Sequence, residues 1–340
     1  MLKLRRGTVA STDPLEVEVG GDVRRAWADE GLVGPCEAGD EVVVNTAAID
    51  LGLGSGGFDV VHVNLTRGLE GGETPPGVHV MKLNYSSLQH AIEPIEEPVE
   101  SAPLPQRPIP VVVLPLHGHL APVAWAARGE GRRIGFVQAG GGGLPGSLSR
   151  DVGELRERGL LGGHVTVAPS YGGEQEAISL TGALHAAAGT LGWDAAIVGP
   201  GPGILGSETR YGHGGMAALD GAHAALALGL PTLLSPRMSA ADPRPRHQGL
   251  SHHTRAVLDL LLAGVSVPAP AALTDLPGGA EAAAALREAA GERHLLLDAD
   301  ADVDGYAESG LPTRTMGRNL DEDRLFFAAA LAAGAALSSS

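Results

Sequence analysis

Three histidines and one glutamate in two loop-like segments are the side chains of this sequence best suited to proton transfer. His213 follows Glu208 in a glycine-rich segment, and His247 and His252 lie in a later, arginine-rich segment. Imidazole titrates near neutral pH, and a carboxylate within hydrogen-bonding reach can orient it. We therefore predict that these histidines carry acid–base catalysis with Glu208 as partner. The alternative is that Glu208 pairs with Arg210 and only orders its loop.

The histidine pair His252–His253 opens a predicted helix, with Ser251 as a suitable N-cap. The positive end of a helix lowers the pKa of a nearby imidazole, which favours a neutral base or ligand. Successive side chains on a helix diverge by about 100°. At most one of the two histidines is therefore expected to face a cleft.

Four arginines in the same two segments are suited to holding an anion. Arg210 lies beside Glu208, and Arg237, Arg244 and Arg246 precede the histidine pair. Guanidinium groups match carboxylate and phosphate oxygens with two parallel hydrogen bonds. We predict that these side chains bind a small anionic metabolite. The alternative is that the second segment is a solvated loop.

A glycine-rich turn between a predicted strand and helix is a second candidate anion site. Gly141, Gly142 and Gly143 permit close backbone approach, and Ser147 stands near the helix start, where free N–H groups favour anions. The alternative is a flexible turn. A dinucleotide is less favoured, because the next strand, VTVAP, does not end in the acidic residue that such sites use.

The segment His117-Gly118-His119 is a candidate metal site. If it continued a strand, both imidazoles would share one face and could bind one ion, with Asp298 or Asp300 as a carboxylate ligand. The alternative is that one histidine caps a helix or bonds to the backbone while the other is exposed. No carboxylate is close to this segment in sequence, and the cofactor is left unknown.

These segments share a position: each follows a short apolar run and precedes a helical stretch. The runs are VVVLPL, IGFVQA, VTVAP, AAIVGP, PTLLSP and HLLLDA. Alternating strands and helices predict a parallel, doubly wound, Rossmann-like α/β sheet of six or seven strands over residues 109–340. In such a sheet the loops after the strands lie at the carboxyl edge, where ligands bind.

The N-terminal residues 1–92 follow another pattern. Short β-branched runs such as LEVEVGG and DEVVVNT are separated by Gly, Asp or Pro, with no helix-length segment between them. This predicts a small β-barrel or sandwich. Residues 93–108 are rich in Pro and Glu and predict a linker.

Composition narrows the class of partner. The net charge of −16 argues against a nucleic-acid or membrane-surface binder, and a single cysteine, Cys36, fits a reducing compartment. The apolar run from Leu325 is shorter than the roughly 20 residues that span a bilayer. We expect a cytoplasmic protein. Because this run is apolar on nearly all sides, we expect its helix to pack against the N-terminal domain or, with slight preference, a second copy in a homodimer.

Four long motifs carry a family resemblance. GDEVVVNTAAIDLGLGSGG, VHVMKLNYSSLQ, GPGILGSETRYGHGGM and RHQGLSHHT together resemble the bacterial family catalogued as domain of unknown function 3866. The resemblance implies a bacterial, cytoplasmic protein, and no catalytic residue can be carried over from it.

Three functions remain open at this point. The first is a hydrolase or group transferase for a small anionic, phosphorylated metabolite. The second is a metal-dependent hydrolase that uses His117 and His119. The third is a binding or sensor protein that holds the same ligand without turnover. The sequence lacks G-x-S-x-G and Walker A motifs, which weakens serine-hydrolase and P-loop interpretations.

Overall fold

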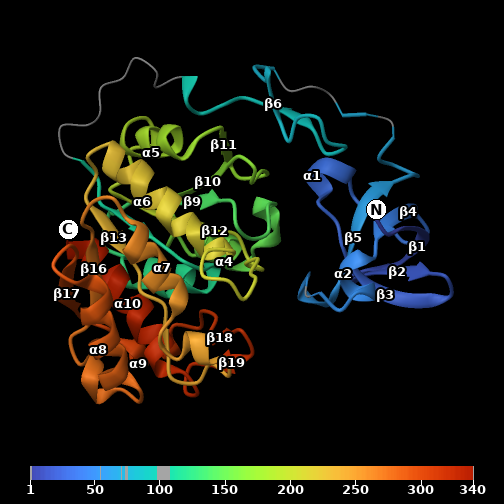
Figure 1. Ribbon diagram of the computed structural model, residues 1–340. Coiled ribbons are helices and arrows are strands. Elements are labelled where there is room, and N and C mark those ends of the chain that lie inside the picture. Colours follow the sequence, from blue (N-terminus) through green and yellow to red (C-terminus); the bar gives the residue numbers. More distant parts are fainter. Residues whose placement is uncertain (1, 54, 70, 73–75, 98–107, 340) are drawn as a thin grey trace. The chain divides into compact units, whose positions relative to one another are not determined.

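The computed structural model describes residues 2–53, 55–69, 71–72, 76–97 and 108–339. It divides the chain into two compact units, Met1–Ala91 and Ile92–Ser340 (Figure 1). The division assigns the predicted linker, residues 93–108, to the second unit, and its described beginning is bonded there. The Ile95 amide donates to the Glu176 carbonyl, and the Glu96 carboxylate accepts from the Ile178 and Ser179 amides. Residues 98–107 of the predicted linker lie outside the described residues.

The N-terminal unit contains the expected barrel. Its strands close in the order β1-β2-β3-β5-β4. They are β1 (Leu4–Thr12), β2 (Leu15–Val19), β3 (Asp22–Trp27), β4 (Glu41–Asn45) and β5 (Asp59–Asn64). The interior is filled by small branched side chains such as Val17, Val42 and Val61. Two four-residue helices, α1 (Glu30–Val33) and α2 (Ala47–Asp50), and a two-stranded sheet of β6 (Val80–Lys82) and β7 (His90–Ile92) accompany it.

The second unit is built on one parallel sheet of eight strands in the order β11-β10-β9-β12-β8-β13-β16-β17 (Figure 1). The strands are β8 (Val111–Val113), β9 (Ile134–Ala139), β10 (Gly163–Val167), β11 (Gln175–Ala177), β12 (Ala195–Pro200), β13 (Thr232–Leu234), β16 (Ser266–Pro270) and β17 (Leu295–Ala299). The predicted Rossmann-like class is thereby confirmed.

Two of these strands are absent from the predicted set, for different reasons. The three-residue strand β11 is polar, and its sequence reads as the start of the following helix. The strand β16 contains Pro268 and Pro270, and proline is disfavoured inside a sheet because it cannot donate a ladder hydrogen bond. β16 pairs along its whole length with β17 but through a single residue pair with β13, so few donors are lost.

Helices cover both faces of the sheet. One core cluster joins Leu114 and Phe136 to α3 (Leu120–Ala126), α4 (Arg150–Glu157), α9 (Val303–Glu308) and α10 (Arg324–Ser339). The other joins Val113 and Val137 to α5 (Leu180–Ala188), α6 (Ala217–Ala227), α7 (His252–Leu260) and α8 (Gly279–Ala290). Among the described residues, no helix has the length and apolarity needed to cross a membrane.

The last helix, α10, is buried nearly all round, as its sequence requires, but its neighbours differ from the expected ones. It packs against α3, α9 and the strands β8, β14 (Met238–Ser239), β16 and β17 of its own unit (Figure 1). Phe326, Phe327 and Leu331 are at most 1% exposed. The helices α3 and α9 of the same unit therefore cover the sides of α10 that the sheet does not. A homodimer stays a prediction without support from this helix.

Gly334 lets α10 approach α3 closely, which gives a stability test. A Cβ at Gly334 would stand 2.3 Å from the Val123 carbonyl oxygen, whereas a Cβ at Gly153, inside α4, would meet open space. We expect Gly334→Ala to lower the free energy of unfolding by about 1–3 kcal/mol through overpacking. Gly153→Ala should raise it by up to about 1 kcal/mol through helix propensity. Urea unfolding measures both, and equal effects would contradict the close approach.

Candidate functional site

The sheet reverses its winding between β8 and β12, and the distinctive loops gather there. The chain leaves β8 towards α3 on one face and leaves the neighbouring β12 towards α6 on the other. Loops that diverge in this way open a crevice at the carboxyl edge. His117, after β8, bridges its floor: its Nδ1 lies 3.0 Å from the Pro200 carbonyl oxygen at the end of β12.

A cavity of about 580 Å³ occupies this crevice. Its lining combines three arginines, one carboxylate and one imidazole with apolar and backbone atoms. The lining residues are Leu116, His117, Gly118, Asp151, Pro202, Gly203, Ile204, Pro243, Arg244, Arg314, Thr315, Met316 and Arg318. The volume suits a small metabolite.

Asp242, fully buried beside this cavity, is the acceptor that organises its arginines. Arg244 donates to both carboxylate oxygens at 2.9 Å, and Arg237 and Arg318 approach Oδ2 at 3.3 and 3.4 Å. Burial alone would raise the pKa of Asp242, but hydrogen bonds from the Arg244 side chain and amide, with the charges of Arg244 and Arg318, outweigh it and lower the pKa. The carboxylate therefore stays ionised.

Arg237 lies inside the protein, not on a solvated loop. It is 1% exposed, and its Nη1 lies 3.3 Å from His253 Nδ1 while Nη2 contacts Asp242 and the Met316 sulfur. Burial lowers the pKa of Arg237 to about 10, which still leaves it charged at neutral pH. The alternative of a solvated loop therefore does not hold for Arg237.

Four imidazoles pack together beside Arg237. His213 ends the loop after β12, His247 lies in η6 (Pro245–His247), and His252 and His253 form the first turn of α7. The rings of His213 and His253 stack at a centroid distance of 3.8 Å, and His252 and His247 lie 4.4 and 4.9 Å from His253. Both members of the pair thus join one cluster with His213 and His247, and neither lines the cavity described above.

The cluster holds its histidines neutral. Burial, followed by the charge of Arg237, lowers the pKa of His247 to about 3. For His252, burial is followed by the neighbouring His213 and Arg246, and its pKa falls to about 4. The pKa of His213 and that of His253 are also lowered, first by burial. Neutral imidazoles keep a lone pair for a proton or a ligand.

Glu208 does not join the histidines. Its side chain is 93% exposed and pairs at 3.5 Å with Arg246, whose side chain is one-third exposed. Arg210 forms an ion pair with Asp259 of α7, and it is the Arg210 carbonyl that receives the His213 Nε2–H bond at 3.0 Å. The structure therefore brings His213, His247 and His252 together but leaves the side chains of Glu208 and Arg210 exposed, outside this cluster.

The glycine turn after β9 packs against the loop after β12. The Gly143 amide donates to the Pro202 carbonyl at 2.6 Å, and a Cβ at Gly142 would stand 2.2 Å from the Gly201 carbonyl oxygen. A Cβ at Gly141 would likewise meet Gly214. These glycines are thus explained by close loop packing. Ser147 is exposed, and Ser149 is the residue whose hydroxyl caps α4, by accepting from the Val152 amide at 3.2 Å.

His117 and His119 lie in a 3-10 turn, η3 (His117–His119), not in a strand, so their side chains do not share a sheet face. Both His117 nitrogens have partners, since Nε2 lies 2.7 Å from the Ser149 hydroxyl. His119 Nδ1 meets the Ser235 hydroxyl at 2.8 Å. The proposed carboxylate ligands, Asp298 and Asp300, are exposed at the end of β17, four strands away from β12 in the sheet order.

Sequence reasoning overlooked Asp151, Arg314 and Arg318 as cavity residues. Arg314 and Arg318 lie in the small hairpin of β18 (Arg314–Thr315) and β19 (Arg318–Asn319), far along the chain from the loops already singled out. Arg318 also donates to Asp323 at 3.0 Å. The available signal was the basic, turn-rich segment between α9 and α10, which follows the last strand of the sheet.

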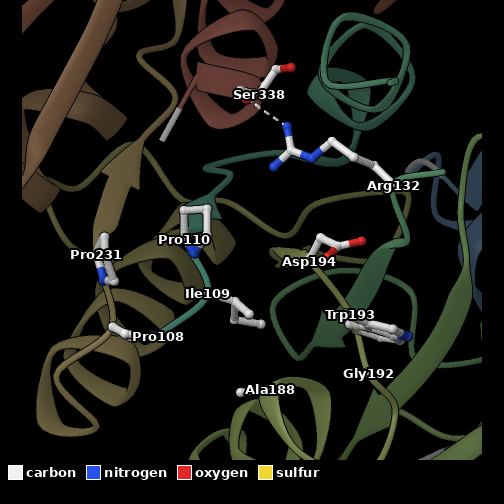
Figure 2. A pocket seen from close by; sticks show the side chains of 10 residues that line it. All are labelled: Pro108, Ile109, Pro110, Arg132, Ala188, Gly192, Trp193, Asp194, Pro231 and Ser338. Carbon is white, nitrogen blue, oxygen red and sulfur yellow. Dashed lines mark hydrogen bonds between the residues drawn. The ribbon is translucent and has the colours of Figure 1, made fainter. Parts of the chain in front are cut away.

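A second cavity, of about 560 Å³, lies at the amino edge of the sheet (Figure 2). Figure 2 shows Arg132 directed at Ser338, whose carbonyl it contacts at 2.8 Å, and it also reaches the Leu337 carbonyl. A cation at the carboxyl end of a helix satisfies its last carbonyl groups. Because Arg132 serves α10 and the edge is opposite to the ligand-binding edge, the first cavity is the stronger candidate.

Comparison with known proteins identifies a family and no closer relative. The model of the family described as "Protein of unknown function (DUF3866)" matches residues 25–334. A search of curated proteins and a search of solved structures each found no match. The family resemblance expected from the motifs is confirmed.

Alanine substitutions at Arg237 and Arg246 should lower the free energy of unfolding by different amounts. Arg237→Ala removes a buried cation, and we expect a loss of about 3 kcal/mol, at the low end for a broken buried ion pair because Asp242 keeps Arg244 and Arg318. Arg246→Ala removes a partner of an exposed glutamate and should cost less than about 1 kcal/mol. Chemical denaturation of both variants is the test. Similar losses would show that Arg246 is structural too.

His119 should make the protein acid-sensitive. Burial, with the charge of Arg237, lowers its pKa to about 3, against roughly 6.5 in an unfolded chain. Its contribution is complete above the unfolded value and is lost as pH falls from about 6.5 towards 3, which amounts to about 2 kcal/mol by pH 5. His119→Gln should therefore show a smaller drop in unfolding free energy between pH 7 and pH 5. Parallel pH profiles for the two proteins would contradict this.

Proposed function

The chain belongs to the DUF3866 family, and from the geometry of its site we propose that it is an enzyme that acts on a small anionic, phosphorylated metabolite by hydrolysis or group transfer. The observation that carries the proposal is the set of three guanidinium groups around the switch-point cavity, with one carboxylate facing them. A chain with a net charge of −16 has concentrated positive charge at this edge.

The arginines differ in how much of their charge is available. Arg244 and Arg318 share the buried carboxylate of Asp242, and Arg318 also serves Asp323. Arg314 is exposed and donates to the Gly317 carbonyl, and no carboxylate of the described residues forms an ion pair with it. Arg314 is thus the guanidinium with most capacity to bind a phosphate, while Asp242 fixes the positions of the other two.

Asp151 supplies the acid–base chemistry of this proposal, and His117 lines the cavity with it. Burial raises the pKa of the Asp151 carboxyl, opposed by the charge of His117, and burial lowers the pKa of His117. A carboxyl with a raised pKa, placed in a cleft, can donate a proton to a leaving group. His117 is held by Pro200 and Ser149, so its role is to set the electrostatics and position of the site.

A binding experiment tests the anion site directly. The full chain should bind inorganic phosphate and pyrophosphate in titration calorimetry. Arg314→Gln should weaken binding about 10- to 150-fold, the equivalent of a lost charge-assisted hydrogen bond of about 1.5–3 kcal/mol. The matched control is Arg287→Gln, an exposed arginine of α8. Equal phosphate affinity in Arg314→Gln and the control would refute the anion site.

Turnover distinguishes the enzyme from a binding protein. Release of phosphate from a panel of phosphate monoesters should depend on Asp151, so Asp151→Asn should lower kcat while phosphate affinity is kept. Phosphate binding without turnover of any ester would instead favour the sensor or binding protein.

A further inference from the structure

We propose that His213, His252 and His253 bind one divalent transition-metal ion of the zinc type. His213 lies on the loop after β12. His252 and His253 open α7, which follows β13. The proposal concerns a site other than the switch-point cavity and does not depend on the anion function.

The three side chains lie close enough together to share one ion. Each offers one nitrogen, and these nitrogens all lie within 4.8 Å of one another. Zinc–nitrogen bonds of about 2.0–2.1 Å in a tetrahedron would set the nitrogens roughly 3.3 Å apart. To bind one ion, the rings of His213 and His253, which stack nearly parallel at an interplanar angle of 11°, must turn so that both lone pairs point at it. His252 is half-buried, while His213 and His253 are 6% and 5% exposed, so the site is open on the His252 side.

A buried lone pair marks the position of the ion. His213 Nε2 faces the Arg210 carbonyl oxygen, which can only accept, so this nitrogen carries the proton and Nδ1 carries the lone pair. Nδ1 is buried and has no hydrogen-bond partner among the described residues. An unsatisfied buried acceptor is costly, and a metal ion would satisfy it.

Gly215 keeps space free beside two of the nitrogens. A Cβ at this position would stand 2.9 Å from His213 Nδ1 and 3.0 Å from His253 Nδ1. Any residue with a side chain would place its Cβ against both Nδ1 atoms. The bond from Arg237 to His253 Nδ1 is long, at 3.3 Å, so an ion competes with a weak partner there.

The chemistry of the donors selects the ion. Neutral imidazoles suit zinc, copper, nickel and iron, whereas magnesium and calcium prefer oxygen ligands. The group contains no carboxylate, and Arg237 lies beside it, so a bound ion would gain from an anion or hydroxide as its next ligand. Three protein ligands leave such a position open, as in catalytic zinc sites. His247 is the neighbour that supports them: its ring lies 4.9 Å from His252, and its Nδ1 lies 2.7 Å from the Ser251 hydroxyl that caps α7.

The test uses the full, untagged chain after removal of metal with a chelator. Titration with Co²⁺ followed by visible absorption, and with Zn²⁺ by calorimetry, should show one ion per chain in a tetrahedral environment. Mg²⁺ should not compete. His252→Gln and His213→Gln should each weaken binding at least 100-fold. His62→Gln, in the N-terminal barrel, is the matched control and should bind as the unmodified chain does.

The outcomes are separable from those of the anion proposal. Circular dichroism of the metal-free variants shows whether they fold, and the half-buried His252 keeps the test valid if His213→Gln does not. Absence of saturable binding, competition by Mg²⁺, or loss of binding in His117→Gln in place of His252→Gln would overturn the metal site. Phosphate affinity of the metal-free chain tests the proposed function independently.

Discussion

One buried carboxylate holds the candidate site together. Asp242 accepts from Arg237 and Arg244 of its own loop and from Arg318 of a distant hairpin. Arg318 also donates to Asp323, which lies just before α10. Asp323 in turn accepts from the Ser239 hydroxyl at 2.6 Å and from the Ala240 amide at 3.0 Å. The loop after β13 is thereby tied to the last helix. Without this anion, three guanidinium groups would repel one another at low dielectric.

The arginines around Asp242 point towards two different groups of side chains. Arg244, Arg314 and Arg318 border the cavity, whereas Arg237 turns its guanidinium towards His253. A single loop therefore contributes to the arginine-lined cavity on one side and to the imidazole cluster on the other. Because Arg237 is buried, its charge acts on the histidines with little screening by solvent, which helps to hold them neutral.

The sequence predicted the architecture well because patterns of short range determine it. Apolar runs and turn residues indicated the barrel, the parallel sheet and the edge that carries the loops. The pattern failed at β16, where the prolines of SVPAP are tolerated because pairing with β13 is minimal. It also did not identify α3 and α9 as neighbours of α10, since amphipathicity shows how much of a helix is buried but not by what.

The candidate site was predictable only in part. His213, His247 and His252 share loops that the sheet topology brings together, and this follows from the alternation of strands and helices. The pairing of Glu208 with Arg246 could not be read from the sequence, because side-chain direction within a long loop depends on its packing. Arg314 and Arg318 could not be predicted for a related reason: they reach the cavity from a hairpin more than 60 residues beyond the β13 loop, and only Arg318 contacts Asp242.

The burial of α10 has a consequence for biosynthesis. Residues 324–339 are translated after every strand of the sheet, yet they complete the core cluster that contains Val112, Leu114 and Phe136. A nascent chain that has already formed its strands still exposes that apolar face, and exposed apolar faces on unfinished domains promote aggregation. Until this helix emerges, the part of the sheet face that it covers therefore stays exposed.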